Sequence, residues 1–126
     1  RKKILNLLLK SYKNQTTLKL SPGKQEIDLV NILDICELVS KICTDIKLKK
    51  IRGFKKFTVS SKKPIKLIQL IKILKMNLKK NLNVKIGALG YRKSESMKCL
   101  RKTYNYPLWK PRFKLIDDLK KIFDKI

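Results

Sequence analysis

The sequence predicts a small α/β (α+β) fold, in which a sheet of about four to five strands is backed by two helices. Short runs of alternating, β-branched residues such as 57–61 are typical of strands. Two longer runs, 26–44 and 65–82, repeat apolar residues at helical spacing. The chain has 126 residues, of which 43% are hydrophobic, and this is enough for one folded domain with an ordinary core.

The first half of the chain is predicted to contain a strand and an acidic helix. Residues 1–14 form a basic N-terminal extension with weak helical character, and residues 16–20 alternate between two faces as a strand does. The helix 26–44 carries, or lies next to, five of the nine acids: Glu26, Asp28, Asp34, Glu37 and Asp45. We interpret these acids as a solvated face turned away from a bound polyanion.

The central part is predicted to form a hairpin, a strand and a second helix. The hairpin pairs 47–52 with 54–60 and turns at Gly53, and the strand 57–61 leads into the helix 65–82. One face of this helix collects five apolar residues, which must therefore be buried: Leu67, Leu70, Ile71, Leu74 and Leu78. The runs 84–89 and 97–104 then predict a closing hairpin around a turn at 91–95.

The C-terminal part differs in character. Residues 105–113 are aromatic, basic and interrupted by two prolines, which exclude regular structure. Tyr106 and Trp109 could stack on a base or pin the segment to the domain's own core, and both alternatives stay open. A short helix is predicted within 114–126, with Leu115, Leu119, Ile122 and Phe123 packing. The domain organisation is thus an extension (1–14), an RNA-binding α/β domain (15–106), and a basic aromatic connector with a short helix (107–126).

The charge distribution predicts the function. The chain has 33 Lys and Arg against 9 Asp and Glu, a net charge of +24, which favours a polyanionic partner. No acid occurs between Ile46 and Ser94, where sixteen Lys and Arg are interleaved with apolar residues, so we expect a folded binding surface. Most cations are lysines, which favour phosphate neutralisation over base reading. The candidate RNA-binding residues are Lys55, Lys56, Lys62, Lys63, Lys72, Lys75, Lys79, Lys80, Arg92, Lys93, Arg101, Trp109 and Arg112.

Catalytic and cofactor chemistry is not indicated. The chain has no His and no glycine-rich phosphate loop, and its carboxylates are concentrated in two regions. We therefore predict that it is not an enzyme and has no cofactor, no metal and no small-molecule substrate. Cys36, Cys43 and Cys99 lack zinc-ligand spacing and are expected to be buried free thiols, as in a reducing compartment. The apolar runs are too short to span a bilayer.

The order of short motifs resembles the eL22 family of eukaryotic large-subunit ribosomal proteins, over about residues 16–104. The family's strand, proline and lysine-rich helix correspond to Phe57-Thr58-Val59-Ser60-Ser61, Pro64 and Leu78-Lys79-Lys80-Asn81. Its closing hairpin corresponds to Lys93-Ser94-Glu95-Ser96 and Leu100-Arg101. Residues 84–87 lack the family's Trp, and a basic segment replaces its acidic tail, so the resemblance is to a divergent member.

This resemblance implies a structural constituent of the large ribosomal subunit in the cytoplasm, with ribosomal RNA and neighbouring ribosomal proteins as partners. One alternative is a ribosomal protein of another family, either organellar or similar to the uS10 family, whose pattern fits residues 51–86 less completely. Another alternative is a basic membrane-surface or interaction protein that uses residues 1–13 and 114–126 as amphipathic anchors.

Overall fold

The computed structural model describes residues 3–99, 104–112 and 114–125. These residues form a small mixed α/β protein with four helices and four two-residue strands. In chain order the elements are α1 (Ile4–Asn14), β1 (Leu18–Lys19), β2 (Glu26–Ile27), α2 (Ile32–Lys47), β3 (Ile65–Lys66), α3 (Leu67–Asn77), β4 (Val84–Lys85) and α4 (Leu115–Asp124). The small α/β fold predicted from the sequence is confirmed at this level.

The strands form two separate sheets of two strands each. β1 pairs in parallel with β4, with Leu18 opposite Val84, and β2 pairs antiparallel with β3, with Ile27 opposite Ile65. The expected single sheet of four to five strands is not present among the described residues. Residues 57–61 are not assigned as a strand. The Thr58 N–H donates to the Tyr104 carbonyl, whereas the Ser61 N–H donates to the Asp28 side chain, so no run of backbone pairing forms here.

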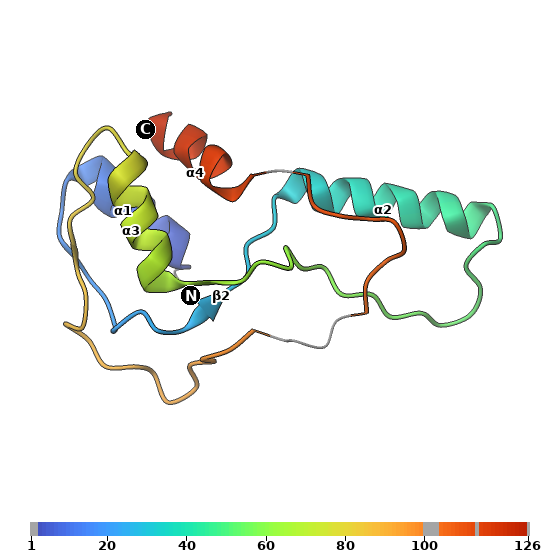
Figure 1. The fold of residues 1–126 in the computed structure, drawn as a ribbon, viewed down its shortest axis with the longest axis horizontal. Helices are drawn as coiled ribbons and strands as arrows, with labels where there is room; N and C mark the ends of the chain where they lie inside the picture. Colours follow the sequence, from blue (N-terminus) through green and yellow to red (C-terminus); the bar gives the residue numbers. More distant parts are fainter. Residues whose placement is uncertain (1–2, 100–103, 113, 126) are drawn as a thin grey trace.

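The main core lies at one end of the molecule, where α1, α3 and α4 gather (Figure 1). We call this end the helical lobe. The predicted apolar face of α3 is buried there, with Leu78 half-buried after the helix ends. The core also takes up Leu8 and Tyr12 of α1 and Leu119 and Phe123 of α4. The two terminal segments therefore supply core residues.

α2 extends away from this lobe, and two extended segments run along one side of it (Figure 1). We call α2 with residues 51–61 and 104–112 the α2 lobe. Its core is small: Leu38, Tyr106 and Trp109 are buried together. Ile42, Ile51 and Phe57 pack against them at the edge. The C-terminal connector thus holds α2 to the chain that follows it.

The predicted helix limits require correction. The first long helix begins at Ile32 rather than 26, because Asn31 caps it by accepting the Leu33 N–H, and residues 26–27 pair with β3 instead. The second helix spans 67–77 rather than 65–82. Its start is defined by the carbonyls of Gly23 and Gln25, which accept the N–H groups of Ile68 and Leu67.

Two predicted hairpins also require correction. No strand is present from 47 to 60, because α2 continues to Lys47 and its end is closed by left-handed Lys49. β4 pairs with β1 and not with residues 97–99, while residues 100–103 of the predicted closing strand lie outside the described residues. The expected turn is present, since the Glu95 N–H donates to the Arg92 carbonyl.

Candidate nucleic-acid interface

The acid-free segment 46–94 runs through both lobes. From the end of α2 it passes along that helix and enters α3 in the helical lobe (Figure 1). Every one of its sixteen Lys and Arg side chains is exposed. Exposed positive charge therefore recurs along the whole interval without acids, which favours a polyanionic partner.

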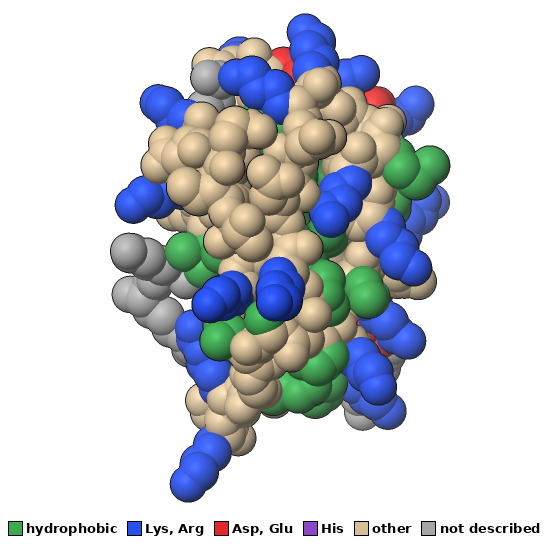
Figure 2. Space-filling model, turned by 90° about the vertical axis from the view of Figure 1, so that its left-hand side faces the viewer, with side chains coloured by type: hydrophobic (Ala, Val, Ile, Leu, Met, Phe, Trp, Pro, Cys, Tyr) green, Lys and Arg blue, Asp and Glu red, His purple; other side chains and the backbone are tan. Residues whose placement is uncertain are grey.

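The structure spreads the predicted binding residues over the molecule and does not gather them into one compact patch. Lys72 and Lys75 lie on α3, and Lys79 and Lys80 lie in the turn that follows it. The other exposed members are in extended chain or turns: Lys55, Lys56, Lys62, Lys63, Arg92 and Lys93. Figure 2 shows Lys and Arg side chains scattered over the end of the helical lobe and around its edges. Arg101 lies outside the described residues.

Lys62 and Lys63 are presented by a turn built on Asp28. The Asp28 carboxylate accepts the Ser61 N–H at 3.0 Å, and the Ser60 hydroxyl accepts the Lys62 N–H at 3.0 Å. Lys62 has a φ of 60°, a left-handed conformation that few L-residues adopt. Because the acid binds backbone and not the ammonium groups, both lysine side chains stay free to meet phosphate.

Lys79 and Lys80 are positioned by α1. The Tyr12 hydroxyl, on a side chain buried in the main core, accepts the Lys80 N–H at 3.2 Å. The Lys80 ammonium lies 6.0 Å from the centre of the Tyr12 ring, within cation–π range. The turn after α3 is therefore anchored to the core while both of its lysines remain exposed.

The acids of α2 and its approach do not form the solvated face that we expected. Asp34 is buried, with 1% exposure, and accepts the Arg112 N–H at 2.9 Å. Glu37 pairs with the Arg112 guanidinium, and Glu26 accepts the Cys99 N–H. Asp45 accepts a hydrogen bond from the Tyr106 hydroxyl and pairs with Lys50. These carboxylates therefore hold other segments of the chain against α2 and β2, and Asp34, the buried one, needs such a partner.

The connector aromatics are packed inside the protein. Tyr106 and Trp109 are 4% and 5% exposed, and Phe57 meets Tyr106 edge-to-face at 5.0 Å. Of the two roles left open for these side chains, the structure favours packing, and Trp109 is covered where a base would have to stack. Arg112 is ion-paired with Glu37. The recurring aromatics near two prolines were the sequence signal of a packed segment.

The Asp45–Tyr106 hydrogen bond changes both acidities. It raises the pKa of Tyr106 to about 12, helped by burial, and it lowers the pKa of Asp45. The ordinary pKa of tyrosine is 10.0, so the stability that this hydrogen bond gives through Tyr106 is complete at pH values below 10. It is lost as the pH rises through the raised pKa of about 12. The stability that Asp45 contributes is present when the pH is above 3.8, the ordinary pKa of this carboxyl. It is lost as the pH falls through the lowered pKa.

Tyr106→Phe is therefore expected to lower stability at neutral pH and to flatten its dependence on pH between 10 and 12. Urea unfolding followed by the fluorescence of Trp109, the one tryptophan, measures both effects. Tyr104→Phe, at an exposed position in the same segment, is the matched control and should leave the profile unchanged. Equal profiles for Tyr106→Phe and the parent protein would contradict the assignment.

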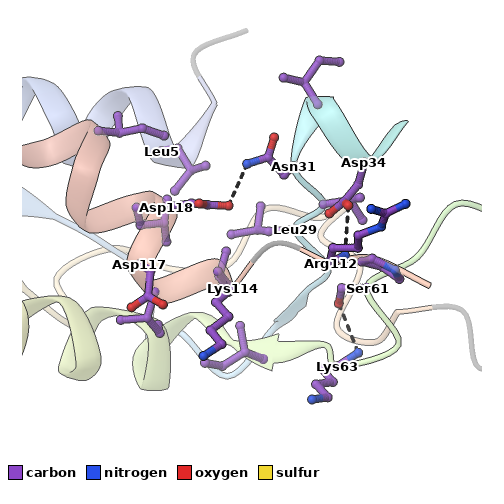
Figure 3. A pocket seen from close by; sticks show the side chains of 18 of the residues that line it. Leu5, Leu29, Asn31, Asp34, Ser61, Lys63, Arg112, Lys114, Asp117 and Asp118 are labelled. Atoms are coloured by element: carbon purple, nitrogen blue, oxygen red, sulfur yellow. Dashed lines mark hydrogen bonds between the residues drawn. The ribbon is translucent and has the colours of Figure 1, made fainter. Parts of the chain in front are cut away.

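A cavity of about 720 Å³ lies between the two lobes (Figure 3). Its lining is mainly apolar, including Leu5, Leu29 and Leu119. The Asn31 amide donates to Asp118 at 2.7 Å across it, and so links the start of α2 to α4. Lys63 and Lys114 extend away from this bond, so the cavity marks the junction of the lobes and is bordered by positive charge.

Cys36 and Cys43 are exposed rather than buried, and Cys99 is half-buried. Across the described ranges, no three His, Cys, Asp or Glu residues are grouped so as to hold a metal ion. Within the same ranges, no helix has the length and apolarity needed to cross a bilayer. Comparison of the sequence with protein-family models and with curated proteins gave no match.

Proposed function

We propose that this chain is a structural RNA-binding protein of the large ribosomal subunit, which binds ribosomal RNA and neighbouring ribosomal proteins. The observation that carries the proposal is that most acids are engaged within the chain while the cations of 46–94 stay exposed. Six of the nine acids bind other parts of the chain: Glu26, Asp28, Asp34, Glu37, Asp45 and Asp118. The sixteen cations of 46–94 remain exposed.

The proposed contacts are with the phosphate backbone. Lysine ammonium groups are point charges, and each phosphate that they neutralise releases counterions from the RNA. Since Tyr106 and Trp109 are buried, base stacking by the connector is left out of the proposed interface. We therefore expect recognition by shape and charge, with the lysines of α3, of its following turn and of the Asp28-supported turn as the main contacts.

The amphipathic ends support RNA over a membrane surface. A membrane anchor needs its apolar face free to enter the lipid. In α1 and α4 this face is occupied, because Leu8 and Tyr12 pack with Leu119 and Phe123 in the main core. Membrane binding by these helices would require the core to open.

The ribosomal context rests on the resemblance to the eL22 family. This proposal includes the prediction that the strands of the domain form one sheet of four to five strands. The Thr58 N–H donates to the Tyr104 carbonyl, which brings the predicted third strand next to the end of the predicted closing strand. The segments carrying this likeness, 57–64 and 78–81, include four of the proposed lysine contacts.

Sedimentation of a lysate of the source cells through a gradient tests the proposal. We expect the protein to travel with large ribosomal subunits and to stay with them through a moderate salt wash, because many phosphate contacts act together. Resolving cytosolic from organellar ribosomes in the same fractions assigns the compartment. A protein that remains at the top of the gradient at low salt would contradict the ribosomal role.

A further inference from the structure

α2 carries an apolar stripe that faces away from the rest of the protein. Five residues form it: Ile32, Cys36, Val39, Cys43 and Ile46. All five are exposed, with Ile32 66%, Val39 52% and Ile46 53% accessible. The helix packs on the chain through its other side, with Asp34, Leu38 and Asp45 directed at the connector. Figure 1 shows α2 at the outer edge of the molecule, with both extended segments on one side of it.

The spacing of this α2 stripe is that of a helix–helix contact. Its members are separated by four, three, four and three residues, which is the repeat that keeps one seam of a helix facing a partner helix. Exposed Leu33 borders the stripe and enlarges the apolar surface. A contiguous apolar seam over the full length of a surface helix is typical of an interface, whereas scattered apolar residues are not.

We propose that the α2 stripe is a homodimer interface, in which α2 packs antiparallel against α2 of a second copy of this chain. The stripe is nearly symmetric about Val39. Reversing it places Val39 opposite Val39, Ile32 opposite Ile46, and Cys36 opposite Cys43. The centres of the two pairs differ by half a residue, or about 0.8 Å of helix rise. A two-fold interface requires this self-complementarity, since each residue must meet its counterpart in both directions.

The charges near α2 favour the antiparallel arrangement. The stripe contains no charged residue, and the acids Asp34, Glu37 and Asp45 are engaged with residues of the same chain. The exposed Lys47, Lys49 and Lys50 cluster at the C-terminal end of the helix. An antiparallel pair holds the two lysine clusters at opposite ends, whereas a parallel pair would bring them together. It also aligns the two helix dipoles favourably.

The net charge of +24 on each copy predicts an unusual salt dependence. Raising the ionic strength shortens the Debye length from about 30 Å at 0.01 M to about 8 Å at 0.15 M, so that repulsion between the copies is screened. Dimerisation should therefore strengthen with salt, while RNA binding weakens. Because dimerisation and RNA binding respond to salt in opposite directions, the two can be measured separately. The dimer proposal can therefore be wrong while the proposed RNA-binding function is right, and the reverse.

Sedimentation velocity of the full chain without RNA, over a range of protein and salt concentrations, is the first test. We expect the dimer fraction to rise with both. Val39→Asp, which opposes two carboxylates at the two-fold axis, should abolish the dimer. Met76→Asp is the matched control, because it makes the same charge change at an exposed residue on α3 and should dimerise normally. A monomer at about 1 mM protein in high salt would overturn the proposal.

Thiol cross-linking tests the orientation. In the antiparallel pair each contact joins one Cys36 to one Cys43, so either Cys36→Ser or Cys43→Ser should remove dimer cross-linking by a short bismaleimide. Cys99→Ser should leave it intact. Cross-linking that survives both single replacements but not the double one would indicate like-to-like contacts and would overturn the antiparallel arrangement.

Discussion

Asp34→Ala is expected to destabilise the protein by about 2–3 kcal/mol, because it removes a charged hydrogen-bond acceptor from a buried site. Asp34 is 1% exposed, lies in the first turn of α2, and accepts the Arg112 N–H at 2.9 Å. Without the carboxylate, that N–H loses its partner and the positive end of the helix dipole loses a negative charge. The connector should then detach from α2 more easily.

Trp109 reports this detachment directly, because it is the one tryptophan and it packs on α2 beside Leu38. Urea titration of Asp34→Ala should give a lower midpoint and a red-shifted emission maximum at low urea. Asp34→Asn keeps an acceptor oxygen and should recover part of the loss.

Glu37→Ala is the matched control for Asp34→Ala, since it removes the exposed ion pair to the same residue, Arg112. Exposed pairs contribute little, so less than about 1 kcal/mol should be lost. Equal losses in the two variants would show that burial of Asp34 does not matter.

Replacing Lys72, Lys75 and Lys79 together by Gln is expected to weaken RNA binding about 100-fold at about 0.15 M salt. If each ammonium neutralises one phosphate, three contacts contribute between about 2 and 3 to the slope of log K against log salt, depending on whether the RNA is single- or double-stranded. Both the affinity and the slope should fall. Folding should change little, because all three side chains are exposed.

Filter binding or fluorescence anisotropy with a ribosomal RNA fragment, repeated at several salt concentrations, measures both quantities. The matched control replaces Lys47, Lys49 and Lys110, three exposed lysines that are not among the main proposed contacts. Both variants lower the net charge from +24 to +21. Identical affinities and slopes for the two triple variants would show that net charge alone drives binding and that α3 has no special part.

The sequence alone determined several local features. The period of Leu67, Leu70, Ile71 and Leu74 predicted the buried face of α3, because only one face of that helix is apolar. Leu119 and Phe123 predicted the packing face of α4 in the same way, whereas Ile122, which was predicted to pack with them, is exposed because it lies at the edge of that face. The absence of acids from 46–94 predicted an exposed basic segment, since unpaired lysines are rarely buried. These features depend on residues close together in the chain.

The tertiary structure decided which way α2 faces and what its acids do. α2 has apolar residues on two sides, so periodicity could not say whether Leu38 or Val39 would be buried. Leu38 is buried because Tyr106 and Trp109, about 70 residues later, pack on it, and Asp34 and Asp45 bind that same segment. Strand pairing was decided in the same way, since the partner of β1 is β4 and not a neighbour in sequence. Contacts at such separations leave no local pattern, so hydrogen-bond satisfaction and burial in the folded chain select them.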